Sequence, residues 1–224
     1  MLTKQFLARV DSLSRLPAEN CLRLTMKGKG WKEHLASGQI EVAGTCWSLL
    51  HLRPVSHLLV IPGFEAQGLQ ALTLVVEYSS HCVSYGPKQG MELDFHDIGH
   101  DHLLIDHRGI RRAFCPRRHR LSFQLPAILA TLAERQCLFT GHSNWLTLEG
   151  NQFGYPDGSR YEVYFNLRRD SARSLKVHVE SAYVRDHGHP SSRPTNLKRH
   201  EKIKGWLLML KKLRNEPIRR PVRR

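Results

Sequence analysis

Three apolar runs in the second half of the chain, residues 144–148, 161–167 and 175–183, are separated by a glycine-rich turn at residues 150–158 and by a polar turn at residues 168–174. Short apolar runs bounded by turn residues are typical of strands joined in sequence order. We therefore predict an antiparallel meander. A further run at residues 72–78 predicts a buried strand that delivers Ser79, Ser80, His81 and Cys82 at its end.

Helical spacing of apolar residues marks three other segments. Residues 2–13 predict a short amphipathic helix that ends before Pro17, and Pro126 begins a helix that continues to about Gln136. Residues 203–213 predict an amphipathic helix with lysines on its second face. These helices would flank the sheet.

The N-terminal region predicts short strands at residues 22–26, 40–42 and 46–52, followed by a connection at residues 55–68 that contains Pro62, Gly63 and Gly68. We expect an α+β protein: an antiparallel β-sheet meander with flanking amphipathic helices, plus a smaller N-terminal β-rich lobe. The expected division is residues 1–68 for the lobe, 69–215 for a nucleic-acid-engaging domain and 216–224 for a basic tail.

Charge points to the class of partner. The 224 residues include 34 Lys and Arg against 20 Asp and Glu, a formal net charge of +14. Such an excess favours polyanions, so we expect a nucleic acid, RNA more than DNA. The alternative is that the charge only maintains solubility. The N-terminal lobe could also contact a protein partner.

Several classes of protein are not indicated. The chain has no apolar run long enough to cross a membrane and no signal-peptide core, so we predict a cytoplasmic protein without membrane contact. The five cysteines form no C-x-x-C pair, which does not favour a zinc ribbon, and they are expected to be small buried residues. We assign no cofactor.

Two basic elements are candidates for phosphate binding. The first is the stretch 108–120, in which Phe114 and Phe123 interrupt or flank the arginines, a combination that suits single-stranded RNA. The second is the C-terminal helix and tail. The predicted nucleic-acid-binding residues are Arg108, Arg111, Arg117, Arg118, Arg120, Lys211, Lys212, Arg219 and Arg220. For each element the alternative is a solvated basic surface.

Histidines supply the candidate chemistry. Metal-independent RNA cleavage needs a general base, a general acid and cations for the charged transition state. His81, His107 and His119 are candidates near Arg111, Arg112 and Arg117, with Ser181 and Tyr183 on the last strand. Residues 94–107 alternate histidine with aspartate, and they leave open a divalent metal site, although the spacing matches no standard motif and we assign no metal.

The order of elements over residues 107–183 resembles the barnase, EndoU, colicin and RelE-like group of small ribonucleases. The resemblance rests on the His- and Arg-rich residues 107–119, the helix at Leu125-Pro126-Ala127-Ile128-Leu129, the strand at residues 161–165 and the strand Val177-His178-Val179-Glu180-Ser181-Ala182-Tyr183. It implies metal-independent cleavage of RNA. The catalytic residues that it implies are His107, Arg112, His119, Ser181 and Tyr183. Residues 1–68 depart from a minimal ribonuclease of this group.

These observations leave four hypotheses: an endoribonuclease of toxin or mobile-element type, a noncatalytic nucleic-acid-binding module, an accessory protein-interaction subunit, and a metal-dependent enzyme that uses residues 96–107. Convergence of the histidines and arginines in one place would favour the first. An open cationic stripe would favour the second.

Overall fold

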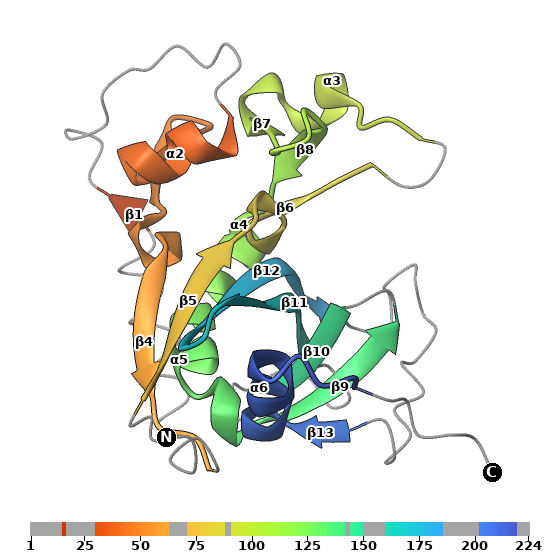
Figure 1. The fold of residues 1–224 in the computed structure, drawn as a ribbon. Helices are drawn as coiled ribbons and strands as arrows, with labels where there is room; N and C mark the ends of the chain where they lie inside the picture. The colour runs from red at the N-terminus through yellow and green to blue at the C-terminus, as the bar shows by residue number, and fades with distance from the viewer. Residues whose placement is uncertain are drawn as a thin grey trace, which may run out of the picture. The chain divides into compact units, whose positions relative to one another are not determined.

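The structure of the protein, a computed structural model, describes residues 15–16, 30–62, 71–87, 91–141, 144–149, 160–185 and 202–218 (Figure 1). The chain forms two compact units. The first unit comprises Met1–Arg53 and Tyr78–Pro126, and the second comprises Pro54–Glu77 and Ala127–Arg224. Because the chain passes between the units at three points, the division expected at residue 68 coincides with no boundary of either unit.

The second unit is built on a seven-stranded sheet in the order β13-β9-β10-β11-β12-β5-β4. Its strands, all paired antiparallel where their partners are observed, are β4 (Val55–Leu59), β5 (Leu72–Tyr78), β9 (Gln136–Gly141), β10 (Asn144–Glu149), β11 (Arg160–Ser171), β12 (Ser174–Arg185) and β13 (Lys202–Lys204). The neighbours β10, β11 and β12 follow one another in the chain, which confirms the predicted meander and the α+β class.

Alternating side chains explain how this sheet acquires a core. On β11, Tyr161, Val163, Phe165 and Leu167 are buried. Helix α6 (Gly205–Leu213) packs against β11 and β12 and buries Leu208, Met209, Leu210 and Leu213. Every second residue of a strand faces the same side of its sheet, and the apolar residues of an amphipathic helix lie along one face. These two patterns allow α6 to cover one side of the sheet.

The first unit contains two three-stranded sheets. One has the order β6-β8-β7 and is formed by β6 (Ser84–Tyr85), β7 (Leu103–Ile105) and β8 (Arg111–Phe114). The other has the order β1-β3-β2 and is formed by β1 (Arg15–Leu16), β2 (Gln39–Val42) and β3 (Thr45–Ser48). Helices α2 (Trp31–Ser37), α3 (Phe95–Ile98) and α4 (Pro116–Ser122) belong to the same unit.

Some predicted elements differ in the structure. The helix expected from Pro126 is α5 (Leu125–Ala130) followed by the 3-10 turn η6 (Leu132–Glu134). The connection expected at residues 55–68 contains strand β4. The helix expected over residues 2–13 lies outside the described residues. Cys46 is disulfide-bonded, so the expectation of a plain buried cysteine does not hold there. Within the described ranges, no helix is long and apolar enough to cross a membrane.

Candidate functional site

The end of strand β5 positions the first part of the site. Tyr78 is buried, and its carbonyl accepts a hydrogen bond from Nε1 of Trp31 at 2.8 Å. Ser79 is extended, and its hydroxyl accepts the backbone N–H of His81 at 3.1 Å, which begins the 3-10 turn η4 (Ser80–Cys82). Short polar side chains cap turns in this way. The strand end therefore holds the His81 backbone in place.

The turn between β7 and β8 positions the second part. One carboxylate oxygen of Asp106, Oδ1, accepts the backbone N–H groups of Arg108 (2.8 Å) and Ile110 (2.9 Å). Gly109 has a φ of 78°, a left-handed conformation that glycine adopts without steric cost. The Asp106 side chain is only 1% exposed. The turn therefore encloses the carboxylate and fixes its direction.

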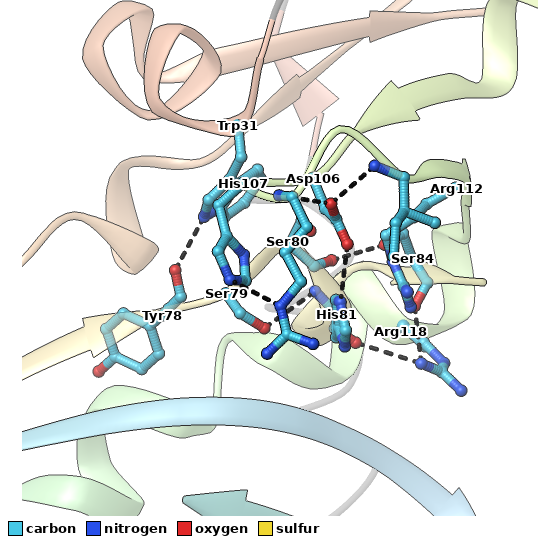
Figure 2. Close-up of polar contacts among 12 residues, drawn as sticks. Trp31, Tyr78, Ser79, Ser80, His81, Ser84, Asp106, His107, Arg112 and Arg118 are labelled. Carbon is cyan, nitrogen blue, oxygen red and sulfur yellow. Dashed lines mark hydrogen bonds and ion pairs between the residues drawn. The ribbon is translucent and has the colours of Figure 1, made fainter. Parts of the chain in front are cut away.

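His81 and Asp106 meet across 25 residues of sequence, with 3.3 Å between Nε2 and Oδ2 (Figure 2). Burial alone would raise the pKa of Asp106, but hydrogen bonds from Ile110 and Arg108 and the contact with His81 hold it below its usual value. The ionised carboxylate is an acceptor, so Nε2 of His81 carries the proton. Nδ1 then holds a lone pair.

Burial lowers the pKa of His81 to about 4, and the charge of Arg112 acts in the same direction while Asp106 opposes both. The imidazole is therefore neutral at pH 7. Its side chain is 28% exposed, and Nδ1 has no hydrogen-bond partner among the described residues. A neutral imidazole with its proton on the carboxylate side presents a base to an incoming ligand.

Two arginines flank this pair through Ser84. The guanidinium of Arg112 donates from Nε to the Ser84 hydroxyl at 2.9 Å, and Arg118 donates from Nη1 to the carbonyls of Ser84 (2.6 Å) and His81 (3.2 Å) (Figure 2). Ser84 is fully buried and donates its own proton to the Ser80 carbonyl. A Cβ on Gly86 would lie 2.5 Å from Nη1 of Arg112, so glycine makes room for this side chain.

Two positive charges lie close together in this cluster. Arg112 is 7% exposed, and burial and then the charge of Arg118 lower its pKa to about 10, which leaves it protonated at neutral pH. Asp106 is the carboxylate that opposes this shift. Two guanidinium groups therefore lie close together here, while His81 is neutral. We call the set His81, Ser84, Asp106, Arg112 and Arg118 the His81–Asp106 site.

Several residues predicted from the sequence lie at or next to this site. Arg112 and Arg118 are part of it, and His107 is close enough to contribute to the low pKa of His81. Arg108 donates from Nε to Nε2 of His107 at 3.3 Å. Other predicted cations of the first unit are exposed, namely Arg111, Arg117 and Arg120. Arg111 lies over the ring of Phe95 at 5.3 Å.

His119 lies elsewhere, in the core of the first unit. It is 0% exposed, and its Nε2 donates to the Ser48 carbonyl at 2.7 Å. The ring packs edge-on against those of Trp47 and Phe123. Since solvent does not reach this ring, we do not include His119 in the candidate site. The two phenylalanines of the basic stretch also pack within the protein. Phe114 is buried, and Phe123 stacks on His51.

Ser181 and Tyr183 lie on β12, in the second unit rather than the first. The hydroxyl of Tyr183 donates to that of Tyr164 at 3.3 Å, and Tyr164 donates to the buried carboxylate of Glu162 at 2.6 Å. The predicted catalytic residues are thus divided between the two units.

The second predicted basic element lies in the second unit. Lys211 and Lys212 are half-buried on α6, and Lys211 pairs with Glu216 at 3.6 Å. Arg219 and Arg220 lie outside the described residues.

Asp94 and His102, in the stretch of histidines and aspartates at residues 94–107, make local contacts. Asp94 caps α3 by accepting the backbone N–H of His96 at 2.8 Å, and His102 Nδ1 lies 3.2 Å from the Phe114 carbonyl. Among the described residues, no group of three or more His, Cys, Asp or Glu side chains is arranged to hold a metal ion.

Sequence reasoning identified His81 as one candidate base but missed its partner Asp106 and the connecting Ser84. A signal for Asp106 was present, because Asp-x-x-Gly after a strand is a turn sequence in which the aspartate binds following backbone N–H groups. The Asp-x-x-Gly sequence predicts a turn, but it does not show which side chain the Asp106 carboxylate contacts.

Comparison with known proteins gives one match. A family model described as the YjaZ family matches residues 39–213, a range that contains the whole His81–Asp106 site. No curated protein and no solved structure matches the chain.

Proposed function

This chain belongs to the YjaZ family, and for this member we propose that the His81–Asp106 site binds the backbone phosphates of nucleic acid, of RNA in preference to DNA. The observation that carries the proposal is the meeting of two guanidinium groups, those of Arg112 and Arg118, at Ser84 beside the neutral His81. Burial and then the charge of Arg118 lower the pKa of Arg112, and both guanidinium groups donate to Ser84. A bound anion would relieve the repulsion between the two groups, and guanidinium groups match phosphate oxygens in geometry.

The surroundings favour a polyanion over a single small anion. Exposed Arg108, Arg111, Arg117 and Arg120 belong to the same unit as the site, and the whole chain has a net charge of +14. Cations spread beside a buried phosphate site suit a ligand that presents successive phosphates. Because Phe114 is buried and Phe123 is stacked on His51, the proposed preference for RNA rests on the 2′-hydroxyl rather than on stacking of bases.

The free lone pair of His81 favours a second function at the same site, metal-independent cleavage of RNA. Nδ1 of His81 would take the proton of a 2′-hydroxyl, and the 2′-oxygen would attack phosphorus. The bond from phosphorus to the 5′-oxygen breaks, and this oxygen needs a proton from an acid. Arg118 would stabilise the charge that develops on the phosphate oxygens. Asp106 holds His81 in the tautomer that this step requires.

His107 is the candidate acid because it lies on the same turn as Asp106 and influences the pKa of His81. Its Nε2 accepts from Nε of Arg108, so that nitrogen carries no proton. A phosphate that draws Arg108 away would free Nε2 for protonation. Binding and acid catalysis would then be coupled through Arg108.

The first experiment measures binding of labelled single-stranded RNA and DNA of one sequence in EDTA. Arg118→Gln removes a charge-assisted contact worth about 1.5–3 kcal/mol, so we expect at least roughly tenfold weaker binding of RNA. Arg168→Gln is the matched control, because Arg168 is an exposed arginine in the second unit. Equal effects of the two variants would show only a general charge effect and would contradict the proposed site.

The second experiment follows the length of the RNA in the same samples. If the site is catalytic, His81→Gln reduces cleavage by about 10²–10⁴-fold, the usual contribution of a general base. His96→Gln is the control, because the side chain of His96 is 93% exposed and lies in the same unit. If the RNA stays intact but binding still depends on Arg118, the proposed binding function stands and the proposed cleavage is wrong. If the chain binds an acidic protein but not RNA, both the proposed RNA binding and the proposed cleavage are wrong.

A further inference from the structure

Strand β4 forms one edge of the seven-stranded sheet. Among the described residues it pairs with β5 alone, in a register that runs from Val55 opposite Val76 to Leu59 opposite Leu72. Figure 1 shows β4 beside β5 at the end of the strand order. The backbone N–H and C=O groups on its outer edge therefore form a row that can accept another strand.

The exposed side chains of this edge are mostly apolar, with Ser56 as the polar exception. Leu58 is 76% exposed and Val60 is 67% exposed, and residues 54–62 contain no charged side chain. The opposite edge strand, β13, has the sequence Lys-Ile-Lys with both lysines exposed. Lysines on an edge strand are a common device against pairing with other chains. The β4 edge lacks this device, although the chain is otherwise rich in lysine and arginine.

Two prolines restrict how another strand can pair here. Pro54 and Pro62 border the segment, and proline has no N–H to donate to a ladder. They are equally distant from Leu58, four residues on each side. In an antiparallel pair of two copies centred on Leu58, each Pro54 lies opposite Pro62 of the other copy. All four prolines then fall at the ends of the ladder, whereas a shifted register would move a proline inward.

We propose that β4 is a self-association strand, and that two copies of this chain pair antiparallel through their β4 edges about a two-fold axis at Leu58. Leu58 then contacts Leu58 of the second copy, and Ser56 lies opposite Val60. Because Leu58 and Val60 share a face by the period of two, the pair buries a cluster of four apolar side chains. The uncharged segment is also a place where two chains of charge +14 can approach.

The size and charge of the contact set its strength. One pair of short strands buries less than the roughly 1,200 Å² of stable complexes, so we expect a reversible dimer that depends on protein concentration. Repulsion between the two basic chains opposes association and is screened by salt. Self-association through β4 should therefore strengthen as salt increases, the opposite of the salt dependence of nucleic-acid binding.

Sedimentation velocity of the full chain over a concentration series tests the proposal, without nucleic acid. We expect a monomer–dimer equilibrium that Leu58→Lys weakens by more than about tenfold, equivalent to about 1.4 kcal/mol. Met91→Lys is the matched control, since Met91 is 67% exposed in the first unit and its substitution should leave association unchanged. A wild-type chain that stays monomeric at every concentration, or equal effects of the two variants, would overturn the proposal.

Cross-linking tests the register. In the proposed pair, Leu58→Cys places two thiols on directly opposite residues, whose Cα atoms lie about 4.5–5.5 Å apart in an antiparallel ladder, within the range of a disulfide. Mild oxidation should therefore give a covalent dimer of Leu58→Cys well above the wild-type background. Ser56→Cys alone should not, because Ser56 faces Val60, whereas a mixture of Ser56→Cys and Val60→Cys should. A dimer from Ser56→Cys alone and none from Leu58→Cys would contradict this register.

Discussion

Replacement of His51 by phenylalanine should change how the stability of the first unit depends on pH. The His51 ring stacks on Phe123 with 3.8 Å between ring centroids, and its Nε2 lies 2.7 Å from the Ser122 hydroxyl. Ser122 donates its own proton to the His119 carbonyl, so Nε2 of His51 is the donor to Ser122. Nδ1 of His51 is buried without a partner. Phenylalanine keeps the stack and removes the titrating group.

Burial, and then the neighbouring His119, lower the pKa of His51 from 6.5 to about 3. The unfolded chain therefore binds a proton at a pH where the folded protein does not. The contribution of neutral His51 to the free energy of unfolding is fully present above pH 6.5. It declines as the pH falls below 6.5 and levels off below about pH 3. At pH 5 the linkage relation gives a loss of about 2 kcal/mol from His51 alone.

Urea unfolding followed by tryptophan fluorescence between pH 8 and pH 5 measures this loss. The free energy of unfolding of His51→Phe should decline by about 2 kcal/mol less than that of the wild type over this range. His96→Gln is the control, because an exposed histidine should leave the slope unchanged. If wild type and His51→Phe decline in parallel, the buried neutral state of His51 is refuted.

Three further variants test other contacts. Gly205→Ala should lower stability by about 1–3 kcal/mol in urea unfolding, because a Cβ there would overlap with the Leu132 carbonyl oxygen. Trp31→Phe should cost about 1 kcal/mol in the same assay, since the Tyr78 carbonyl loses its donor. Asp106→Asn should lower the pKa of His81 still further in an NMR titration, because the carboxylate now raises it; an increase would contradict this assignment.

Much of the fold could be predicted because local patterns determine it. The run at residues 72–78 coincides with β5, and the three later runs coincide with β10, β11 and β12. The stripe at residues 203–213 contains α6, which begins at Gly205. Strands β5, β11 and β12 and helix α6 each bury a regular set of side chains, so their periodicity is visible in the sequence.

The basic stretch at residues 108–120 was harder to interpret, because its charges obscure its structure. Residues 111–114 form β8, and residues 116–122 form α4. His119 occupies the buried face of α4, although its neighbours in sequence are Arg118 and Arg120. Composition alone could not separate that buried position from an exposed one.

The candidate site also depends on contacts that sequence spacing does not reveal. Its two halves are brought together because β6 and β7 both pair with β8. The divided set of predicted catalytic residues has the same origin, since β12 belongs to a different unit from α4. Long-range strand pairing, and not residue type, decides which histidine meets a carboxylate.

The pKa of His81, measured by NMR with and without RNA, tests the central claim most directly. A 2′-O-methyl oligonucleotide retains the phosphates that the site is proposed to bind but has no free 2′-hydroxyl to react, and His81→Gln identifies the signal. Phosphate next to the imidazole favours its protonated form, so we predict a pKa that rises from about 4 by at least roughly one unit. Binding of the oligonucleotide with no change in the pKa of His81 would place the nucleic acid elsewhere and contradict the account.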